Sequence, residues 1–367
     1  MSSPRLVVLG NSLTALAVVR DAADAGLNPI LVDNQPDVAQ RTRRAQVVRF
    51  EEGASDYDVL DAILALADEG PMSLIATSDR WVRFIMNNRL VVGQAFERVL
   101  HPRNEALEIC SDKALFLHWC RERGFPVPVS WFPILEDRPE ELTLPVIIRP
   151  TTTRHGDAAK VIPKAIEVRT EEDLERWLDT YRDHGVEAVV SQSLLGRKLE
   201  QISIPIARTP EALLSFVARK VRPLPDRCAV GSMVELWPDE NLDTLACWIA
   251  EAIDFYGIGE LEVLRDTETG ESWVIELNPR PWLQYALAPA AGYDFLNLVM
   301  GRPLRNLGQQ RRQGRTWIEF RGDLFNAFSR SIGSVRSGEQ SMGSYLSSLW
   351  RANVNARFSW KDLPASF

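Results

Sequence analysis

The sequence is poor in the residues that disulfide frameworks and metal centres need. Its 367 residues include only four cysteines and four histidines. The cysteines, Cys110, Cys120, Cys228 and Cys247, form no CxxC pair, and the histidines show no metal-ligand spacing. The pattern therefore predicts neither a disulfide framework nor a zinc site, and it is typical of reduced thiols in the cytoplasm.

Long apolar runs and an excess of positive charge are also missing. No apolar run reaches the roughly 18 residues that a membrane-spanning helix needs. The apolar part of residues 5–20 is interrupted by polar residues and followed by charged ones, which argues against a signal peptide. The formal charge of −8 (42 basic and 50 acidic residues) argues against general nucleic-acid or membrane-surface binding. We expect a cytoplasmic protein without nucleic-acid or membrane partners.

What is present at the start of the chain is an alternation of strand and helix patterns. Residues 5–10 predict a buried strand, residues 12–26 a helix, and residues 28–33 a second strand. This order predicts a Rossmann-like parallel sheet with right-handed crossovers. Only Gly10 remains of a GxGxxG pattern, so a scaffold without NAD is favoured. Residues 77–79 (TSD) follow a later strand, at the edge where such sheets bind ligands.

The patterns become mixed after about residue 110. A helix is expected to begin after Ser111 as N-cap, and another begins with a capping-box pattern at Thr170. Short strands, mostly antiparallel, are expected between them and up to about residue 236. Beyond Gly301 the sequence is rich in Arg, Gln, Ser and Gly, and we expect a helical C-terminal extension there.

The stretch GELEVLRDTETGESWVIELN, residues 259–278, predicts a hairpin whose turn is DTETGE. If the turn is symmetric, Glu262 lies opposite Glu276 and Glu260 opposite Asn278, so these side chains project from one side of the sheet. A register slip of one residue would separate them.

Two facing carboxylates destabilise a sheet unless a positive charge compensates them. Glu262, Glu276 and Asn278 offer the oxygen ligands that Mg²⁺ prefers, and Mg²⁺ keeps further positions for waters and phosphates. The alternative is an exposed hairpin whose carboxylates are balanced by arginines. Arg280 favours the metal interpretation, because a metal-bound phosphate also needs a fixed positive charge.

The motif ELNPR, preceded by ELEVLRD, resembles the metal-binding signature of the ATP-grasp superfamily, E-x-N-x-R after an acidic strand residue. The continuation PWLQYALAPAAGYDF resembles the amino-acid (carboxylate–amine) ligase-like branch, which includes D-aspartate ligases. The resemblance covers about residues 70–300, and the opening strands match the pre-ATP-grasp domain.

The resemblance implies an α/β and α+β fold in which a Rossmann-like pre-ATP-grasp domain precedes a two-subdomain ATP-grasp fold. The expected ranges are 1–110 for the pre-ATP-grasp domain, 111–190 for the N-terminal (lid) subdomain, 191–301 for the C-terminal subdomain with the metal site, and 302–367 for the C-terminal extension.

In this family a carboxylate attacks the γ-phosphate of ATP to give an acylphosphate, from which an amine displaces phosphate. The resemblance implies that Glu262, Glu276 and Asn278 bind Mg²⁺ between the β- and γ-phosphates, with Mn²⁺ as a substitute. Arg280 would be the catalytic residue that steadies the phosphoryl group. The implied activity is an ADP-forming ligase that makes an amide or peptide bond from small-molecule carboxylate and amine substrates, with amino acids expected. The oligomeric state is open, a homodimer included.

The resemblance also implies a nucleotide-binding set. Lys113 matches the lysine just before the grasp fold, and Lys164 the lysine after the flexible phosphate-covering loop. Arg149 stands where the family usually has Lys, which keeps the charge but changes the phosphate geometry. The remaining candidates are Gln192 and Leu194 for the adenine edge, Glu200 for the ribose, and Arg222, or Lys220 in its place, for the triphosphate.

Other interpretations remain open. Lys113 could be a solvated residue at a helix start, and Arg149 and Arg222 could lie at strand ends or edges in solvent. A second hypothesis is a nucleotide-binding protein of the same fold with little ligase activity, a sensor or scaffold, which Arg149 and a loop with only Gly156 favour. A third, an NAD-dependent oxidoreductase, depends only on the first 33 residues.

Overall fold

The computed structural model describes residues 4–33, 37–51, 53–153, 157–223, 231–307, 315–328 and 341–366. Its internal contacts divide the chain into two compact units. Unit 1 comprises Met1–Arg103, Ile204–Glu260 and Pro279–Phe367, and unit 2 comprises Asn104–Ser203 and Leu261–Asn278. Two strands, β10 (Leu199–Arg208) and β14 (Gly257–Asp266), have residues in both units. The four ranges expected from the sequence remain a prediction.

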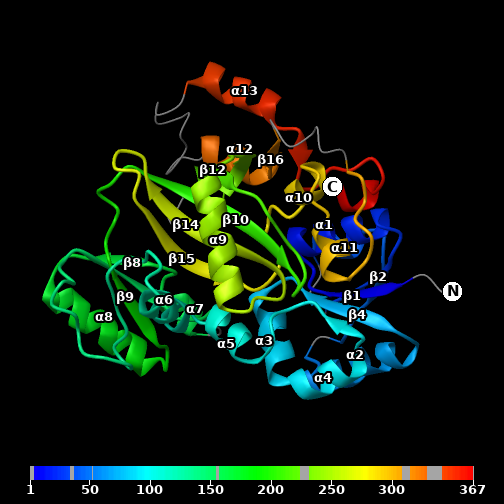
Figure 1. Ribbon diagram of the computed structural model, residues 1–367, viewed down its shortest axis with the longest axis horizontal. Helices are drawn as coiled ribbons and strands as arrows, with labels where there is room; N and C mark the ends of the chain where they lie inside the picture. The colour runs from blue at the N-terminus through cyan, green and yellow to red at the C-terminus, as the bar shows by residue number, and fades with distance from the viewer. Residues whose placement is uncertain are drawn as a thin grey trace. The chain divides into compact units, whose positions relative to one another are not determined.

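Unit 1 opens with a parallel five-stranded sheet in the order β3-β2-β1-β4-β5 (Figure 1). The predicted strand, helix and second strand are all present. Both faces of β1 are covered, which explains its uninterrupted apolar run. The strands are β1 (Arg5–Leu9), β2 (Asn28–Val32), β3 (Gln46–Val48), β4 (Met72–Ala76) and β5 (Arg98–Val99), and the helices are α1 (Leu13–Asp24), η1 (Val38–Arg41), α2 (Asp56–Asp68), α3 (Asp79–Asn87) and α4 (Arg89–Ala95).

Gly10 follows β1 for a packing reason. Its φ is +131°, a conformation that favours glycine. A Cβ at this position would lie 2.2 Å from Oγ1 of Thr77, just beyond β4. The close approach of the two strand ends therefore explains this glycine without a dinucleotide.

The second part of unit 1 is a mixed sheet. Its strands run in the order β14-β10-β12-β13-β16-β17, and β11 pairs with β10. The additional strands are β11 (Leu213–Ser215), β12 (Ala218–Pro223), β13 (Gly231–Leu236), β16 (Thr316–Ile318) and β17 (Val354–Asn355). The helices are α9 (Glu240–Ala252), α10 (Leu287–Ala290), α11 (Phe295–Val299), α12 (Phe320–Phe328), α13 (Met342–Arg351) and η3 (Leu363–Ser366).

The C-terminal extension is helical only in part. Its described residues contain α12 and α13, but they also contribute β16, which pairs antiparallel with β13, and β17, which pairs parallel with β16. The extension therefore completes a sheet of unit 1.

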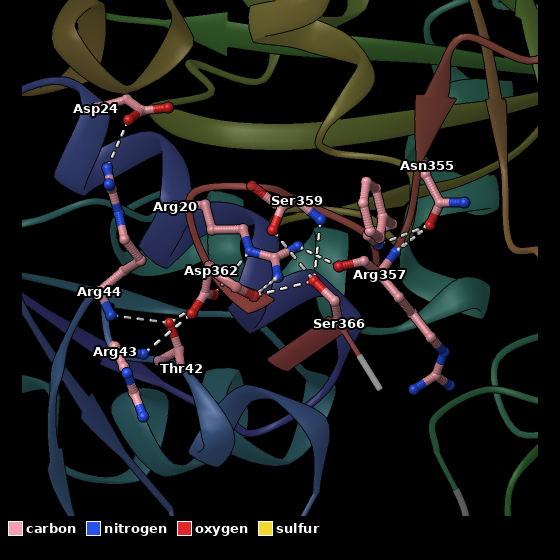
Figure 2. Close-up of polar contacts among 11 residues, drawn as sticks. Arg20, Asp24, Thr42, Arg43, Arg44, Asn355, Arg357, Ser359, Asp362 and Ser366 are labelled. Carbon is pink, nitrogen blue, oxygen red and sulfur yellow. Dashed lines mark hydrogen bonds and ion pairs between the residues drawn. The ribbon is translucent and has the colours of Figure 1, made fainter. Parts of the chain in front are cut away.

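A buried carboxylate attaches the C-terminal segment to the first sheet's connections. The side chain of Asp362 is fully buried and accepts hydrogen bonds from Nε of Arg20 (2.9 Å), Oγ1 of Thr42 (2.8 Å) and the backbone N–H of Arg43 (3.0 Å). Figure 2 shows these groups converging on Asp362, while Arg20 also donates to the carbonyl oxygen of Arg357 (2.7 Å). A buried charge with this many partners has its desolvation compensated.

A second buried network joins α1 to the segment that follows the ELNPR motif. The hydroxyl of Tyr285 donates to Asp21 (2.7 Å), and Nη2 of Arg305 donates to Asp21 (2.8 Å) and also to Asp294. Burial raises the pKa of Asp21 and also that of Tyr285. Part of the PWLQYALAPAAGYDF stretch is therefore explained by packing.

Unit 2 contains a four-stranded antiparallel sheet in the order β6-β9-β7-β8, together with β15 and the adjoining parts of β10 and β14. Helix α8 contributes Leu174 and Tyr181 to its core. The strands are β6 (Ser130–Trp131), β7 (Val146–Pro150), β8 (Ile166–Val168), β9 (Ala188–Gln192) and β15 (Ser272–Asn278), and the helices are α5 (Asn104–Ser111), α6 (Lys113–Glu122), α7 (Ala158–Val161) and α8 (Glu171–Asp183).

Two helix starts were predicted in unit 2. The start of α8 is confirmed, and the start of α6 lies one residue from the predicted one. Thr170 caps α8 as predicted, accepting a hydrogen bond from the N–H of Asp173 (3.2 Å). The N-cap of α6 is Asp112, because its carboxylate accepts from the N–H groups of Ala114 and Leu115, while Ser111 ends α5. In neither unit is any described helix both long and apolar enough to cross a membrane.

Candidate active site

The predicted hairpin exists as β14 and β15, but its turn is not symmetric. The N–H of Asp266 donates to the carbonyl oxygen of Glu271 (2.8 Å), and the N–H of Gly270, with φ at +77°, donates to that of Asp266 (2.9 Å). Asp266 therefore pairs with Glu271, one residue away from the register that puts Glu262 opposite Glu276. The turn gives no support to that facing pair.

Glu276 and Asn278 do lie together. They are two residues apart on β15, so they project from the same face of the strand. Nδ2 of Asn278 lies 3.5 Å from Oε1 of Glu276, and both residues are half-buried. Glu262 is half-buried on the neighbouring strand β14.

Lys113 belongs to the same cluster. Its Nζ lies 3.0 Å from Oε2 of Glu276, and the two side chains remain 30% and 21% exposed. Its backbone N–H donates to the carbonyl oxygen of Thr151 (2.9 Å), directly after β7. Lys113 is therefore not a purely solvated residue at a helix start, since it compensates the charge of Glu276.

Two further cationic residues that were predicted to bind phosphate, Arg149 and Lys164, lie near the carboxyl end of β7. Arg149 is half-buried on β7, opposite Val189 of β9. Lys164 is exposed and lies two residues before β8, whose first residue, Ile166, pairs with Ile148 of β7. Lys113, Arg149 and Lys164 thus all lie near the carboxyl end of β7. The predicted phosphate-covering loop includes residues 154–156, Gly156 among them, which lie outside the described residues.

The predicted adenine residues lie at the other end of β7. Gln192 pairs with Val146, and its N–H donates to the carbonyl oxygen of Val129 (2.8 Å). Leu194 is buried, and its carbonyl oxygen accepts the N–H of Arg197 (3.0 Å), so a contact with a base would use the N–H of Leu194. Val146 and Arg149 are three residues apart, which is roughly 10 Å along a strand. Glu200 is half-buried on β10.

Arg197, which the sequence analysis overlooked, connects this segment to the hairpin turn. Its Nη1 lies 2.6 Å from Glu271 and 3.3 Å from Asp266, and its guanidinium lies 4.8 Å from the ring centre of Trp273. The charge at Arg197 in the sequence SLLGRK could have suggested such a contact, but its partners lie about 70 residues further along the chain.

Arg280 lies in unit 1, where it forms an ion pair with Asp79. Nε of Arg280 donates to Oδ1 of Asp79, and Nη1 lies 3.2 Å from the carbonyl oxygen of Pro281. Asp79 is the first residue of α3, just beyond β4, in the TSD stretch expected at a ligand-binding edge. The role predicted for Arg280 in phosphoryl transfer remains a prediction, and the structure shows that its guanidinium is paired with Asp79.

His101 fixes the backbone next to Arg280. Its ring is buried, with Nε2 accepting from the N–H of Ala76 (2.7 Å) and Nδ1 donating to the carbonyl oxygen of Pro279 (2.8 Å). Burial lowers the pKa of His101 to about 4, so the ring is neutral at pH 7. His101 connects the end of β4 to the ELNPR segment, and no local pattern in the sequence indicated this.

Arg222 has a different setting from the predicted one. Its Nε and Nη2 bind both carboxylate oxygens of Asp323 (2.7 and 2.8 Å), and its Nη1 donates to Ser348 (2.5 Å). All three guanidinium nitrogens are used within unit 1. The structure therefore gives Arg222 a structural ion pair and no support for the predicted contact with a triphosphate.

The donor set of the cluster fits magnesium held together with a nucleotide. Among the described residues, no three His, Cys, Asp or Glu side chains are arranged to hold a metal ion by themselves. Mg²⁺ needs only one or two protein carboxylates when phosphates and waters supply the remaining ligands. Glu276 and the amide of Asn278 meet that requirement, with Glu262 on the adjacent strand.

Comparison with solved structures identifies proteins of similar fold. N5-carboxyaminoimidazole ribonucleotide synthetase from Thermotoga maritima is 18% identical with a TM-score of 0.59, over 84% of this chain and 78% of that chain. The biotin carboxylase domain of Hydrogenobacter thermophilus 2-oxoglutarate carboxylase, solved as a dimer with MgADP and bicarbonate, is 18% identical with a TM-score of 0.65, over 83% and 71%. L-amino acid ligase from Bacillus licheniformis is 14% identical with a TM-score of 0.62, over 85% and 76%.

At these identities the likeness shows the fold alone. No family model matches the sequence, and no curated protein matches it. The structural relatives agree with the predicted ATP-grasp type of fold, a mixed α/β architecture with several sheets. They do not single out the D-aspartate ligase branch. The chain therefore has the fold of these ATP-grasp structures.

Proposed function

We propose that the protein is an ATP-dependent, ADP-forming ligase that joins a carboxylate to an amine through an acylphosphate, with amino acids as substrates. The proposal includes a cytoplasmic location. It keeps the expected roles of the lid subdomain and of the C-terminal subdomain in nucleotide binding.

One observation carries the proposal: the contact of Lys113 with Glu276 beside Asn278. A lysine, a carboxylate and an amide in half-exposed contact can bind a Mg²⁺-bound phosphate, because the lysine can move from the carboxylate to the phosphate oxygens. A purely structural ion pair does not need the amide or the solvent access.

The two ends of β7 suggest how a nucleotide would lie. Arg149 and Lys164, near the carboxyl end, would hold phosphate oxygens, and Gln192 and Leu194, at the other end, would hold the base. Glu200 would bind the ribose. A bound Mg²⁺ would neutralise charge on the terminal phosphates. In this proposal Arg280, oriented by Asp79, stabilises the charge that develops on the transferred group.

The structural relatives agree with this chemistry as far as their own descriptions go. One is described in complex with MgADP and bicarbonate, another in complex with ADP, and a third as an L-amino acid ligase. The likeness to an amino acid ligase is the reason to test amino acids first.

A second candidate function is a nucleotide sensor or scaffold of the same fold. Arg149 in the place of the usual lysine favours it, and so does the ion pair of Arg280 with Asp79, since a guanidinium already paired with a carboxylate is less available to a phosphate. Such a protein would bind Mg·ATP but release no ADP with any substrate pair.

The deciding experiment measures ADP release over a matrix of amino acids, with mass spectrometry of the products. We expect ADP and phosphate from at least one pair, and no activity without Mg²⁺. With ¹⁸O in the substrate carboxylate, one label should appear in the phosphate. AMP as product, or label kept wholly in the amide, would exclude the acylphosphate route; binding without turnover would favour the sensor.

A further inference from the structure

Helices α12 and α13 have their polar and apolar faces reversed. A helix on the surface of a globular protein normally turns its apolar face inward. In α12 the inward residues include Asp323 and Asn326, both buried, whereas the outward ones are large and apolar. The exposed apolar residues of α12 are Phe320, Leu324, Phe325 and Phe328.

Helix α13 repeats the arrangement. It buries Tyr345 and Ser348, and it exposes an apolar row in which each residue lies four positions after the last. This row consists of Met342, Leu346 and Trp350, and the side chain of Trp350 is 91% exposed. Residues at this spacing lie on one face of a helix.

The reversed faces are held in place by a polar network beneath them. Arg222 on β12 binds Asp323 of α12 through two nitrogens and Ser348 of α13 through the third. Ser232 on β13 donates to the same carboxylate (2.8 Å). Because Asp323 is fully buried, rotating α12 to bring its apolar side inward would expose the arginine and break these bonds.

The two helices are in contact with each other. The rings of Phe328 and Tyr345 meet edge to face, with their centres 5.5 Å apart. Figure 1 shows α12 and α13 as neighbours at the edge of unit 1. We call the outward side chains of the two helices the α12–α13 surface.

We propose that the α12–α13 surface is the contact between two copies of this chain. At their exposed fractions, the four aromatic side chains present on the order of 500 Å², taking roughly 150–250 Å² for each aromatic side chain, and Leu324, Met342 and Leu346 add to this area. The largest apolar patch on a typical monomer is about 300–600 Å². A standard interface buries about 800 Å² on each partner, so the surface has the size that a stable dimer needs.

Charge argues for a protein partner and against a membrane surface. The charged side chains on the outward side of the two helices are Arg321 on α12 and Arg351 on α13. Helices that lie on membranes have a polar face rich in Lys and Arg, whereas the polar face here is buried around Asp323. An apolar row can pack against its own symmetry copy, because a twofold interface brings the same patch together from both subunits.

The test is sedimentation equilibrium of the full chain from about 1 to about 100 µM. We expect a dimer in this range. Trp350→Asp combined with Leu346→Asp, and separately Phe325→Asp, should each raise the dissociation constant at least thirtyfold, the size expected for central apolar contacts. The matched control is Trp248→Asp, on α9, which removes an aromatic side chain that is 60% exposed, close to the 62% of Phe325, and should leave the dimer intact.

These substitutions change exposed side chains, so circular dichroism should show an unchanged fold. A monomer at all concentrations would overturn the proposal, as would a dimer that resists both α12–α13 variants. Flotation with phosphatidylserine vesicles provides the other arm: binding to vesicles that Trp350→Asp abolishes, with no dimer in solution, would assign the surface to a membrane. This inference stands independently of the ligase activity.

Discussion

The carboxylates that contact Arg305 in unit 1 and the carboxylate that contacts Lys113 in unit 2 differ in how deeply they are buried. Around Arg305 in unit 1, Asp21 and Asp294 are almost fully buried, and the hydroxyl of Tyr285 provides a further hydrogen bond. Around Lys113 in unit 2, Glu276 forms an ion pair with Lys113 at 3.0 Å, and both side chains retain access to solvent. The first cluster is closed by its own partners, while the second can exchange its partner for a ligand.

The difference shows which charges serve the fold and which are available for chemistry. A buried charge is stable only when its partners surround it, and removing one partner is then costly. A half-exposed pair contributes little to stability but can be rearranged by a phosphate or a metal ion. Arg222 belongs to the first kind despite its position among the predicted cationic residues, and Lys113 belongs to the second.

The largest effect should come from breaking the closed cluster. Arg305→Met leaves the buried carboxylates of Asp21 and Asp294 without their cation, and we expect the free energy of unfolding to fall by about 3–5 kcal/mol. Urea denaturation measures this. The control Arg302→Met removes one hydrogen bond, to the carbonyl oxygen of Ala25, and should cost about 1 kcal/mol. Equal losses in the two variants would contradict the comparison.

The second prediction concerns how the stability depends on pH through His101, a buried group that, unlike the closed cluster, is uncharged in the folded protein. The pKa of buried His101 is about 4, below its usual 6.5, so the unfolded chain binds a proton between these values and the folded chain does not. Stability should therefore fall as the pH drops from about 6.5 to about 4, by up to roughly 3 kcal/mol from this residue, and stay level above that range.

His101→Gln keeps one donor and one acceptor but cannot titrate. The difference in unfolding free energy between this variant and the wild type, measured by urea denaturation from pH 4.5 to 7, isolates the contribution of the histidine. Parallel curves for the two proteins would mean that the ring is protonated or solvated in the folded state.

Arg280 has an intermediate character, since it forms an ion pair with Asp79 and its side chain is partly exposed. Arg280→Lys retains a charge but loses the planar fork, so we expect the rate constant of the ligase to fall about a hundredfold with little change in ATP affinity. Single-turnover kinetics separates the two quantities. Asp79→Asn is the companion variant and should also lower the rate constant, because Asp79 holds the guanidinium. Normal turnover in Arg280→Lys would leave Arg280 a structural role only.

The smallest of these effects should come from opening the exposed cluster. Glu276→Gln removes the charge that binds Lys113 and, in the proposal, Mg²⁺. We expect Mg·ATP affinity to fall about 10–100-fold in calorimetric titration, with unfolding unchanged to within about 1 kcal/mol. Glu271→Gln, at the turn of the same hairpin, is the matched control and should bind normally. Unchanged binding in Glu276→Gln would remove the metal assignment.

Local patterns predicted the elements better than the contacts between them. The alternation of β14 and β15 and the polar turn between them predicted the hairpin, because apolar periodicity and turn residues act over a few positions. The turn itself is one residue away from the predicted symmetric arrangement, because the N–H of Gly270 donates to Asp266 while Asp266 pairs with Glu271. The predicted N-cap of α6 was wrong by one residue. Ser111 and Asp112 are adjacent and both could accept the hydrogen bonds, so the backbone geometry decides which of them caps the helix.

Contacts between distant residues had no signal in a single sequence. Asp323 lies 101 residues after Arg222, and nothing near either residue indicates the other. Pro279 lies 178 residues after His101. Lys113 and Glu276 were each named from the family resemblance, but the contact between them was not predicted. The reversed faces of α12 and α13 became visible only once burial was known.

The attachment of Asp362 has a consequence for how the protein is made. Its partners Arg20 and Thr42 are synthesised early, and the carboxylate that satisfies them is added 342 residues after Arg20. At about 5–20 residues per second, a ribosome needs some tens of seconds to cover that length. During this interval Arg20 and Thr42 lack the carboxylate that accepts their hydrogen bonds, so this attachment forms only after Asp362 has been synthesised.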